Sequence, residues 1–216
     1  MIVTTLNFHL DFISPYAYLA FARLPATLAG HDVRVNYVPV LFAALLRHNG
    51  QLGPAEIAAK RDWTYRQVQW LAHANGVALD LPTAHPFNPL ALLRLALATV
   101  TEGNPGREAC ATIFEHVWQG GHDATDPERI AALTKKLAPV RDPAGGEVKV
   151  ELGNNTDAAI RQGIFGVPTI SVDDKQFWGF DSLPMLRAWL DGDSWFDSGA
   201  WEAPARIAIG AARRKA

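Results

Sequence analysis

The order in which strand-like and helical patterns follow one another is the feature that most constrains the fold of this chain. Residues 6–12 alternate between apolar and polar side chains, which is the two-residue period of a strand. A Ser-Pro pair then starts a helix that ends near Gly30, and a second apolar strand follows at residues 33–38. The chain therefore opens as strand, helix, strand, and the connection is long enough for a parallel crossover.

The middle of the chain, from about residue 40 to residue 155, shows helical periods alone. Four helices are expected there, beginning at Pro54, after Pro89, around Cys110 and at Asp126-Pro127. Residues 142–146 are expected to form a loop. Strand patterns then return. The elements expected in this last part are a short helix at residues 156–162, a strand at residues 169–172, a tight turn at Asp173-Asp174, a partner strand at residues 175–178 and a final helix from Leu183.

The resulting order, β-α-β followed by a helical block and then α-β-β-α, predicts an α/β protein with a thioredoxin-like fold that is interrupted by an all-helical insertion domain. Residues 1–40 and 156–190 are expected to form the discontinuous thioredoxin-like domain. Residues 41–155 are expected to form the helical insertion domain, and residues 191–216 a C-terminal extension.

Composition excludes several classes of function. The 216 residues include 20 Lys and Arg against 22 Asp and Glu, and this net charge of −2 argues against a nucleic-acid partner. The N-terminus lacks a basic leader, and the apolar stretches fall short of the roughly 20 residues that cross a bilayer. We therefore expect no membrane partner and a cytoplasmic location. The seven His residues show no metal-ligand spacing, so no metal is expected.

The position of sulfur in the chain bears directly on its chemistry. The single cysteine, Cys110, lies on an apolar helical stripe, which predicts a core thiol. A thioredoxin-like fold has its reactive position where the first strand meets the first helix, and that position holds Ser14 with no Cys-x-x-Cys pair. Amide groups at a helix start favour an anion, so Ser14 can hold a thiolate that a bound ligand supplies. Ordinary N-capping explains the same serine, and on pattern alone it is the commoner use.

Two further segments are candidates for a binding site. Pro168 precedes a strand and is a candidate cis peptide, which would leave the backbone of Val167 free to pair with an extended ligand. An ordinary trans proline at a strand entrance is the alternative. Residues 177–182 form a turn into the last helix, where Asp181 either caps the helix or holds the ammonium group of a ligand.

Several of these segments, taken together, resemble the 2-hydroxychromene-2-carboxylate isomerases. These enzymes are relatives of the kappa-class glutathione transferases and share a fold with periplasmic thiol-disulfide oxidoreductases. The resemblance spans roughly residues 2–190 in the same order. The motifs that carry it are Asp11-Phe12-Ile13-Ser14-Pro15-Tyr16, Lys60 with Asp62 and Trp63, His85-Pro86-Phe87-Asn88, Phe165-Gly166-Val167-Pro168-Thr169, and Phe177-Trp178-Gly179-Phe180-Asp181.

The resemblance implies roles for particular residues. Ser14 matches the catalytic serine that holds the glutathione sulfur as a thiolate, and Val167 matches the residue whose backbone pairs with the glutathione cysteine. The loop that holds the γ-glutamyl end corresponds to Trp178, Gly179, Phe180 and Asp181. The positions that face the substrate correspond to Lys60, His85 and Asn88. One departure is Ser182, where relatives often carry Arg.

The activity that the resemblance implies is a glutathione-dependent cis-trans isomerisation of a 2-hydroxychromene-2-carboxylate-like substrate in aromatic catabolism. The thiolate adds to the substrate, the new single bond rotates, and elimination regenerates glutathione, which is thus a cofactor. The expected partners are glutathione, a small aromatic carboxylate and a second copy of the chain in a homodimer. Two alternatives stay open: a kappa-class-like glutathione transferase that releases conjugates, and a thioredoxin-fold binding protein without catalysis.

Overall fold

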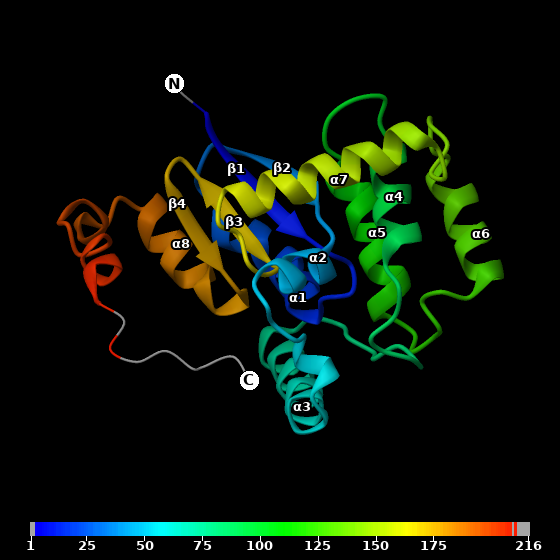
Figure 1. Cartoon of the computed structure of the whole chain (residues 1–216), viewed down its shortest axis with the longest axis horizontal. Helices are drawn as coiled ribbons and strands as arrows, with labels where there is room; N and C mark the ends of the chain where they lie inside the picture. The colour runs from blue at the N-terminus through cyan, green and yellow to red at the C-terminus, as the bar shows by residue number, and fades with distance from the viewer. Residues whose placement is uncertain (1–2, 209, 211–216) are drawn as a thin grey trace.

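A computed structural model describes residues 3–208 and residue 210, and its centre is a mixed four-stranded sheet in the order β2-β1-β3-β4 (Figure 1). β1 and β2 are parallel, whereas β3 is antiparallel to both β1 and β4. The strands are β1 (Thr4–Leu10), β2 (Val33–Pro39), β3 (Thr169–Val172) and β4 (Lys175–Trp178). The predicted strand-helix-strand start and the predicted hairpin are confirmed, and with them the thioredoxin-like fold.

Each face of the sheet is covered by a different set of helices, because side chains alternate between the two faces of a strand. Leu6, Phe8 and Leu10 of β1 lie in the main core, which also holds residues of α1 (Pro15–Leu28). A second apolar cluster contains Val40, which follows β2, together with Leu45 and residues of α7 (Gly146–Arg161), the helix that precedes β3. Helices therefore cover both faces of the sheet. The carboxyl-terminal end of β1, where the chain enters α1, is the place where we expect a site.

The helical insertion lies beside the sheet, and α3 projects from the body of the molecule (Figure 1). Its helices are α2 (Phe42–His48), α3 (Ala58–Asn75), α4 (Leu90–Ala98), α5 (Arg107–Trp118) and α6 (Pro127–Leu137). A short 3-10 turn at Pro54–Glu56 precedes α3, so the helix expected from Pro54 is broken at Ile57. Among the described residues, no helix is long and apolar enough to cross a membrane.

α7 (Gly146–Arg161) is longer than the sequence analysis predicted. The expected loop at residues 142–146 is confirmed up to residue 145, whereas the expected helix start at Thr156 is wrong, because the helix begins ten residues earlier. Val148, Leu152 and Ala159 are buried along one side of it, and this apolar stripe outweighs the poor helix formers at residues 153–155. The boundary predicted between residues 155 and 156 thus falls inside a continuous helix.

The chain after β4 folds back onto that strand. α8 (Leu183–Leu190) is followed by two short 3-10 turns, Ser194–Asp197 and Ala203–Arg206. Phe196 is buried, and its ring lies 6.2 Å from that of Phe177 in β4. The described part of the predicted extension therefore packs against the fold, whereas its residues 209 and 211–216 lie outside the described residues.

Candidate active site

Ser14 lies at the junction of β1 and α1, and its hydroxyl has two partners. The amide of Ala17 donates to Ser14 Oγ at 3.2 Å, so the capping interpretation is confirmed. The same hydroxyl donates to the carbonyl oxygen of Val167, 3.3 Å away. Ser14 is 6% exposed, and the N-terminus of α1 adds the positive end of a helix dipole beside its hydroxyl. The serine is therefore both a cap and a bridge to the loop before β3.

The Val167-Pro168 peptide is cis, as predicted. This loop is tied to its neighbours, since the Thr169 hydroxyl donates to the Gly166 carbonyl at 2.7 Å and the Gly179 amide donates to the Pro168 carbonyl at 2.9 Å. Within the described part of the chain, the amide of Val167 donates to no other group. The loop thus presents a free amide and a weakly engaged carbonyl beside Ser14, which is the pair that an extended ligand needs.

The turn at residues 178–181, after β4, forms a second wall of the candidate site and is joined to the loop before β3 through the bond from the Gly179 amide to the Pro168 carbonyl. Gly179 has φ +90° and ψ 164°, a conformation essentially confined to glycine, and leads into the 3-10 turn Phe180–Ser182. A Cβ on Gly179 would lie 2.5 Å from Oδ1 of Asp181. The Ser182 hydroxyl closes the turn by donating to the Gly179 carbonyl at 2.8 Å. Asp181 itself is exposed and available to a ligand.

Trp178 adds an aromatic surface to this wall. Its ring packs against that of Phe165, with centroids 4.8 Å apart, and yet it stays 54% exposed. The indole lies directly over Gly166, where a Cβ would come within 2.6 Å of Nε1 of Trp178. A residue larger than glycine at that position would therefore displace the tryptophan.

The three residues predicted to face the substrate have different surroundings. His85 lies against the turn before Ser14, because its Nε2–H donates to the Ile13 carbonyl at 2.8 Å. Asn88 is exposed, and its side-chain oxygen accepts from the amide of Leu90 at the start of α4. Lys60 is exposed near the start of α3. Only His85 of these three is hydrogen-bonded to the segment that carries Ser14.

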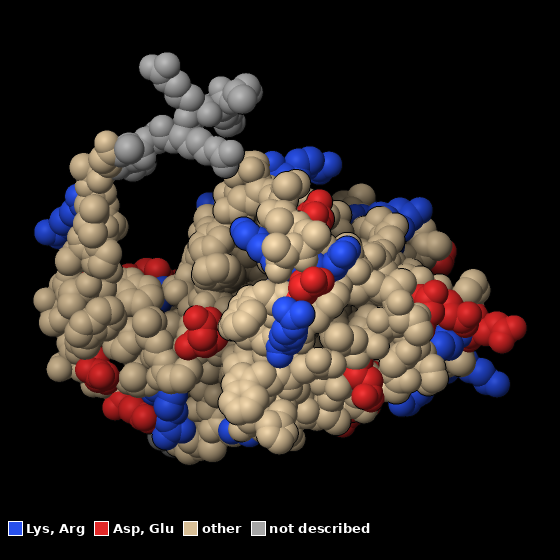
Figure 2. Space-filling view, turned by 90° about the horizontal axis from the view of Figure 1, so that it is seen from below, with Lys and Arg blue, Asp and Glu red and all other residues tan. Residues whose placement is uncertain are grey.

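Helix geometry relates Lys60 to the site. The Tyr16 hydroxyl donates to Oε1 of Gln67 at 2.7 Å, which places the middle of α3 beside the first turn of α1. Lys60 precedes Gln67 by seven residues, so it lies on the same face of α3, about 10 Å along the axis. Basic and acidic side chains are interspersed on the side of the molecule that Figure 2 shows. Lys60 is thus an exposed cation on the face of α3 that also carries Gln67.

Two residues that support the turn at residues 11–14 were missed as site residues by the sequence analysis. Asp11 is fully buried, and its carboxylate accepts from the amides of Ile13 at 3.2 Å and Phe42 at 3.0 Å. Burial raises the pKa of Asp11 to about 7, against the opposing effect of these two amides. Trp118 lies on the apolar stripe of α5 that also holds Cys110, and its Nε1–H donates to the Phe12 carbonyl at 2.9 Å. The signal that could have identified Asp11 is an acidic side chain where the strand pattern ends, three residues before Ser14.

Comparison with known protein families decides the classification. The family described as DSBA-like thioredoxin domain matches residues 5–191. The chain belongs to this family. Among curated relatives of this DsbA-like domain, a 2-hydroxychromene-2-carboxylate isomerase of Sphingobium xenophagum is 27% identical over 197 residues, which are 86% of this chain and 97% of the relative. The human glutathione S-transferase kappa 1 is 25% identical over 209 residues, which are 88% and 92% of the two chains.

A solved structure gives the same fold. The structure of a 2-hydroxychromene-2-carboxylate isomerase superposes on this DsbA-like domain with a TM-score of 0.76 at 22% identity, covering 91% of this chain and 98% of the other. The predicted resemblance to this isomerase family and to the kappa-class transferases is therefore confirmed. The roles of individual site residues remain predictions.

The one thiol of this DsbA-like domain lies away from Ser14. Cys110 is fully buried in α5, as predicted, and burial raises the pKa of its thiol to about 12. A thiol with such a pKa stays protonated at neutral pH and is a poor nucleophile. Any reactive sulfur at Ser14 must therefore come from a ligand.

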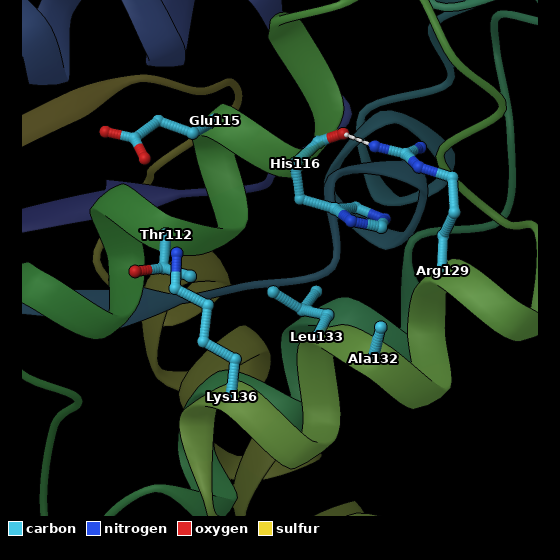
Figure 3. Close-up of a pocket in the computed structure, with 7 residues that line it drawn as sticks. All are labelled: Thr112, Glu115, His116, Arg129, Ala132, Leu133 and Lys136. Atoms are coloured by element: carbon cyan, nitrogen blue, oxygen red, sulfur yellow. Dashed lines mark hydrogen bonds between the residues drawn. The ribbon is translucent and has the colours of Figure 1, made fainter.

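A surface pocket of about 300 Å³ lies between α5 and α6 and includes none of the predicted site residues (Figure 3). Arg129 points across it from α6 and donates to the carbonyl of His116 at 2.8 Å. His116 in turn donates through Nε2 to the Ala124 carbonyl at 2.9 Å. These polar groups fasten the start of α6 to the end of α5, so the pocket is explained by the packing of the two helices.

Proposed function

We propose that this DsbA-like domain is a glutathione-dependent isomerase that acts on a 2-hydroxychromene-2-carboxylate-like aromatic substrate. The observation that carries the proposal is the Ser14 hydroxyl, which lies at the start of α1 within 3.3 Å of the Val167 carbonyl, in a chain whose one cysteine is buried. A redox role needs a thiol at this position. A hydroxyl there instead suits a sulfur that the ligand brings.

The groups around Ser14 fit a peptide that carries a thiolate. The Val167 amide is free to donate to a backbone carbonyl of the ligand, and the Val167 carbonyl can accept a backbone N–H once the Ser14 hydroxyl turns away from it. Ser14 Oγ keeps the Ala17 amide as its donor throughout. The hydroxyl proton is thereby free to point at a sulfur without leaving the helix start uncapped.

The remaining contacts with the ligand come from the turn at residues 178–181. Asp181 offers a carboxylate for the ammonium group of a γ-glutamyl end, and Gly179 and Phe180 shape the turn that presents it. Trp178 gives this end of the ligand an apolar surface. Lys60, on the same face of α3 as Gln67, supplies a positive charge for the carboxylate of an aromatic substrate. Bound glutathione would supply the thiolate that adds to the unsaturated carbon and is later eliminated.

What the residues of the chain contribute is stabilisation of that thiolate. The helix start and the Ser14 hydroxyl both favour the charged form over the thiol. The buried setting of Ser14 and Val167 strengthens both effects, since electrostatic interactions grow as water is excluded. Because the same sulfur attacks and then leaves, the site must stabilise it without trapping it. One hydroxyl donor and a helix dipole match this requirement better than a cation would.

Two measurements test the proposal. Calorimetry with glutathione should show binding at millimolar concentration or below, and the absence of heat at that concentration would contradict any glutathione-dependent role. The ultraviolet absorbance of a hydroxychromene carboxylate, followed with enzyme and glutathione, should change as the trans isomer forms. A kappa-class-like transferase would instead consume glutathione, which mass spectrometry of the products would reveal. The relative named glutathione S-transferase kappa 1 keeps this alternative in view.

A further inference from the structure

The peptide group that joins Ile13 to Ser14 is held at both ends. Its amide, on Ser14, donates to the Asp11 carbonyl at 3.0 Å. Its carbonyl, on Ile13, accepts from His85 Nε2–H at 2.8 Å. The orientation of this peptide plane sets the direction of the Cα–Cβ bond of Ser14, because only the φ torsion of Ser14 lies between the plane and that bond. His85 therefore acts on the same peptide unit that carries the Ser14 side chain.

The imidazole of His85 is held in the tautomer that this contact needs. The Tyr65 hydroxyl lies 2.9 Å from Nδ1 and 3.0 Å from the carbonyl oxygen of His85. A carbonyl only accepts, so the contact with Ile13 requires the proton on Nε2. Nδ1 of the neutral ring is then an acceptor, and it shares the single hydroxyl proton of Tyr65 with the His85 carbonyl. Burial lowers the pKa of His85, which favours the neutral ring near pH 7.

Packing fixes the ring as firmly as the hydrogen bonds do. The imidazole lies between the rings of Tyr65, Phe87 and Trp118, with centroids 5.6, 6.0 and 5.5 Å away. Both ring nitrogens are occupied by the protein, so neither is left for a proton of the substrate. The ring is thus built as a support and not as a free acid or base.

We propose that His85 is a positioning residue, which aims the Ser14 hydroxyl by holding the Ile13 carbonyl. This inference rests on the proposed function and replaces the predicted substrate contact of His85 with an indirect role. The helical insertion supplies the support, since His85 follows Ser14 by 71 residues in the sequence. The site at the end of β1 is therefore completed by a segment outside the thioredoxin-like part of the chain.

Three variants separate positioning from simple stability. His85→Phe keeps a flat ring in the aromatic cluster and removes the hydrogen bond to Ile13. His85→Gln keeps a donor nitrogen near the position of Nε2 and should restore much of the function. His116→Phe is the matched control, because it also removes a bond from a half-buried histidine to a backbone carbonyl, that of Ala124, between α5 and α6.

The pKa of the thiol in the glutathione complex, followed by thiolate absorbance, is the main measurement. We expect His85→Phe to raise that pKa and to lower kcat by about tenfold, with a smaller change in KM, because a misaimed donor stabilises the thiolate less. His116→Phe should match the wild type in both quantities. A wild-type thiol pKa and kcat in His85→Phe would overturn the inference, as would an equal loss in His116→Phe.

A measurement without ligand keeps this test apart from that of the proposed function. Hydrogen exchange at the Ser14 amide should be faster in His85→Phe than in the wild type or in His116→Phe, since the peptide plane is then held from one side. If the wild type binds no glutathione, the proposed function fails, and the exchange result alone decides whether His85 holds the peptide. Unchanged exchange at Ser14 would contradict the positioning role.

Discussion

The two walls of the candidate site are built in opposite ways. In the turn at residues 11–14, the protein itself supplies partners for successive backbone groups: Asp11 for the Ile13 amide, Trp118 for the Phe12 carbonyl and His85 for the Ile13 carbonyl. In the turn at residues 178–181, Trp178 and Asp181 are exposed, and the conformation depends on one glycine. The first wall is held by hydrogen bonds before any ligand binds. The second wall depends on exposed side chains and one glycine, so substitutions there can change its shape.

This contrast suggests that the first wall serves catalysis and the second wall serves ligand recognition. A donor that stabilises a developing or held charge works best when it is oriented in advance, because no reorganisation is then needed during the reaction. Contacts to the distant end of a ligand need only add affinity. Substitutions in the first wall should therefore lower kcat or global stability, and substitutions in the second should weaken binding.

The largest effect is expected at Ser14. Ser14→Ala removes the hydroxyl donor, and kcat should fall by about 100-fold, as it does when one donor of an oxyanion hole is lost. The fold should remain, since losing one cap costs about 1 kcal/mol. Steady-state kinetics and urea unfolding measure the two effects. Asp126→Ala is the control, because Asp126 caps α6 through the amide of Arg129 in the same manner. Equal turnover in the two variants would refute the role of Ser14.

Two buried titratable groups, Asp11 in the first wall and His9 in β1, should determine part of the pH dependence of stability. Burial raises the pKa of Asp11 to about 7, so between pH 4 and pH 7 the folded state binds more protons at this group than the unfolded state. Stability from Asp11 is then fully present below pH 4 and falls as pH rises, by up to about 1.4 kcal/mol per pH unit. Burial lowers the pKa of His9 to about 4, and its effect has the opposite sign.

These opposed groups predict a pattern across variants. Relative to the wild type, Asp11→Asn should gain stability with each pH unit from 4 to 7, because the falling contribution has been removed. His9→Gln should lose stability over pH 4 to 6.5 relative to the wild type for the converse reason. Urea unfolding at several pH values measures both. Parallel curves for the three proteins would show that neither buried group titrates as stated.

The sequence predicted those parts of the molecule that local patterns determine. The hairpin at residues 169–178 matched because its turn and its alternation are contiguous, and Pro168 was found because the expected fold placed it beside Ser14. α7 was predicted too short, since Gly153 and two asparagines interrupt the helical propensity while burial of Val148 and Leu152 maintains the helix. Tertiary packing therefore determines the length of α7, and a local sequence pattern carries no information on that packing.

The support of the Ser14 turn escaped prediction for a different reason. The contact of Trp118 with Phe12 joins residues 106 apart, and that of His85 with Ile13 joins residues 72 apart. Neither pair leaves a spacing signal, and a tryptophan on an apolar helical stripe is already explained by the core. Such contacts become visible only when the insertion and the sheet are placed in space together.

The second wall should respond through affinity. Gly179→Ala forces a side chain into a backbone region reserved for glycine and pushes Asp181 from its position, so glutathione should bind about tenfold more weakly. Calorimetry measures this change. Gly192→Ala is a fitting control, because Gly192 also has a positive φ, of +79°, but a Cβ there meets nothing within 4 Å. If both variants bind as the wild type does, the turn plays no part in holding the ligand.

The smallest effect is expected at the edge of the site, from the exposed cation on α3. Lys60→Gln should raise KM for an aromatic carboxylate by about threefold and leave kcat unchanged, because an exposed ion pair contributes little and acts equally on substrate and transition state. The difference should shrink as salt is raised, since screening weakens such pairs. Lys135→Gln, an exposed lysine of α6, should change neither constant. A fall in kcat in Lys60→Gln would instead place this lysine with the oriented donors around Ser14, and the division between the two walls would no longer hold.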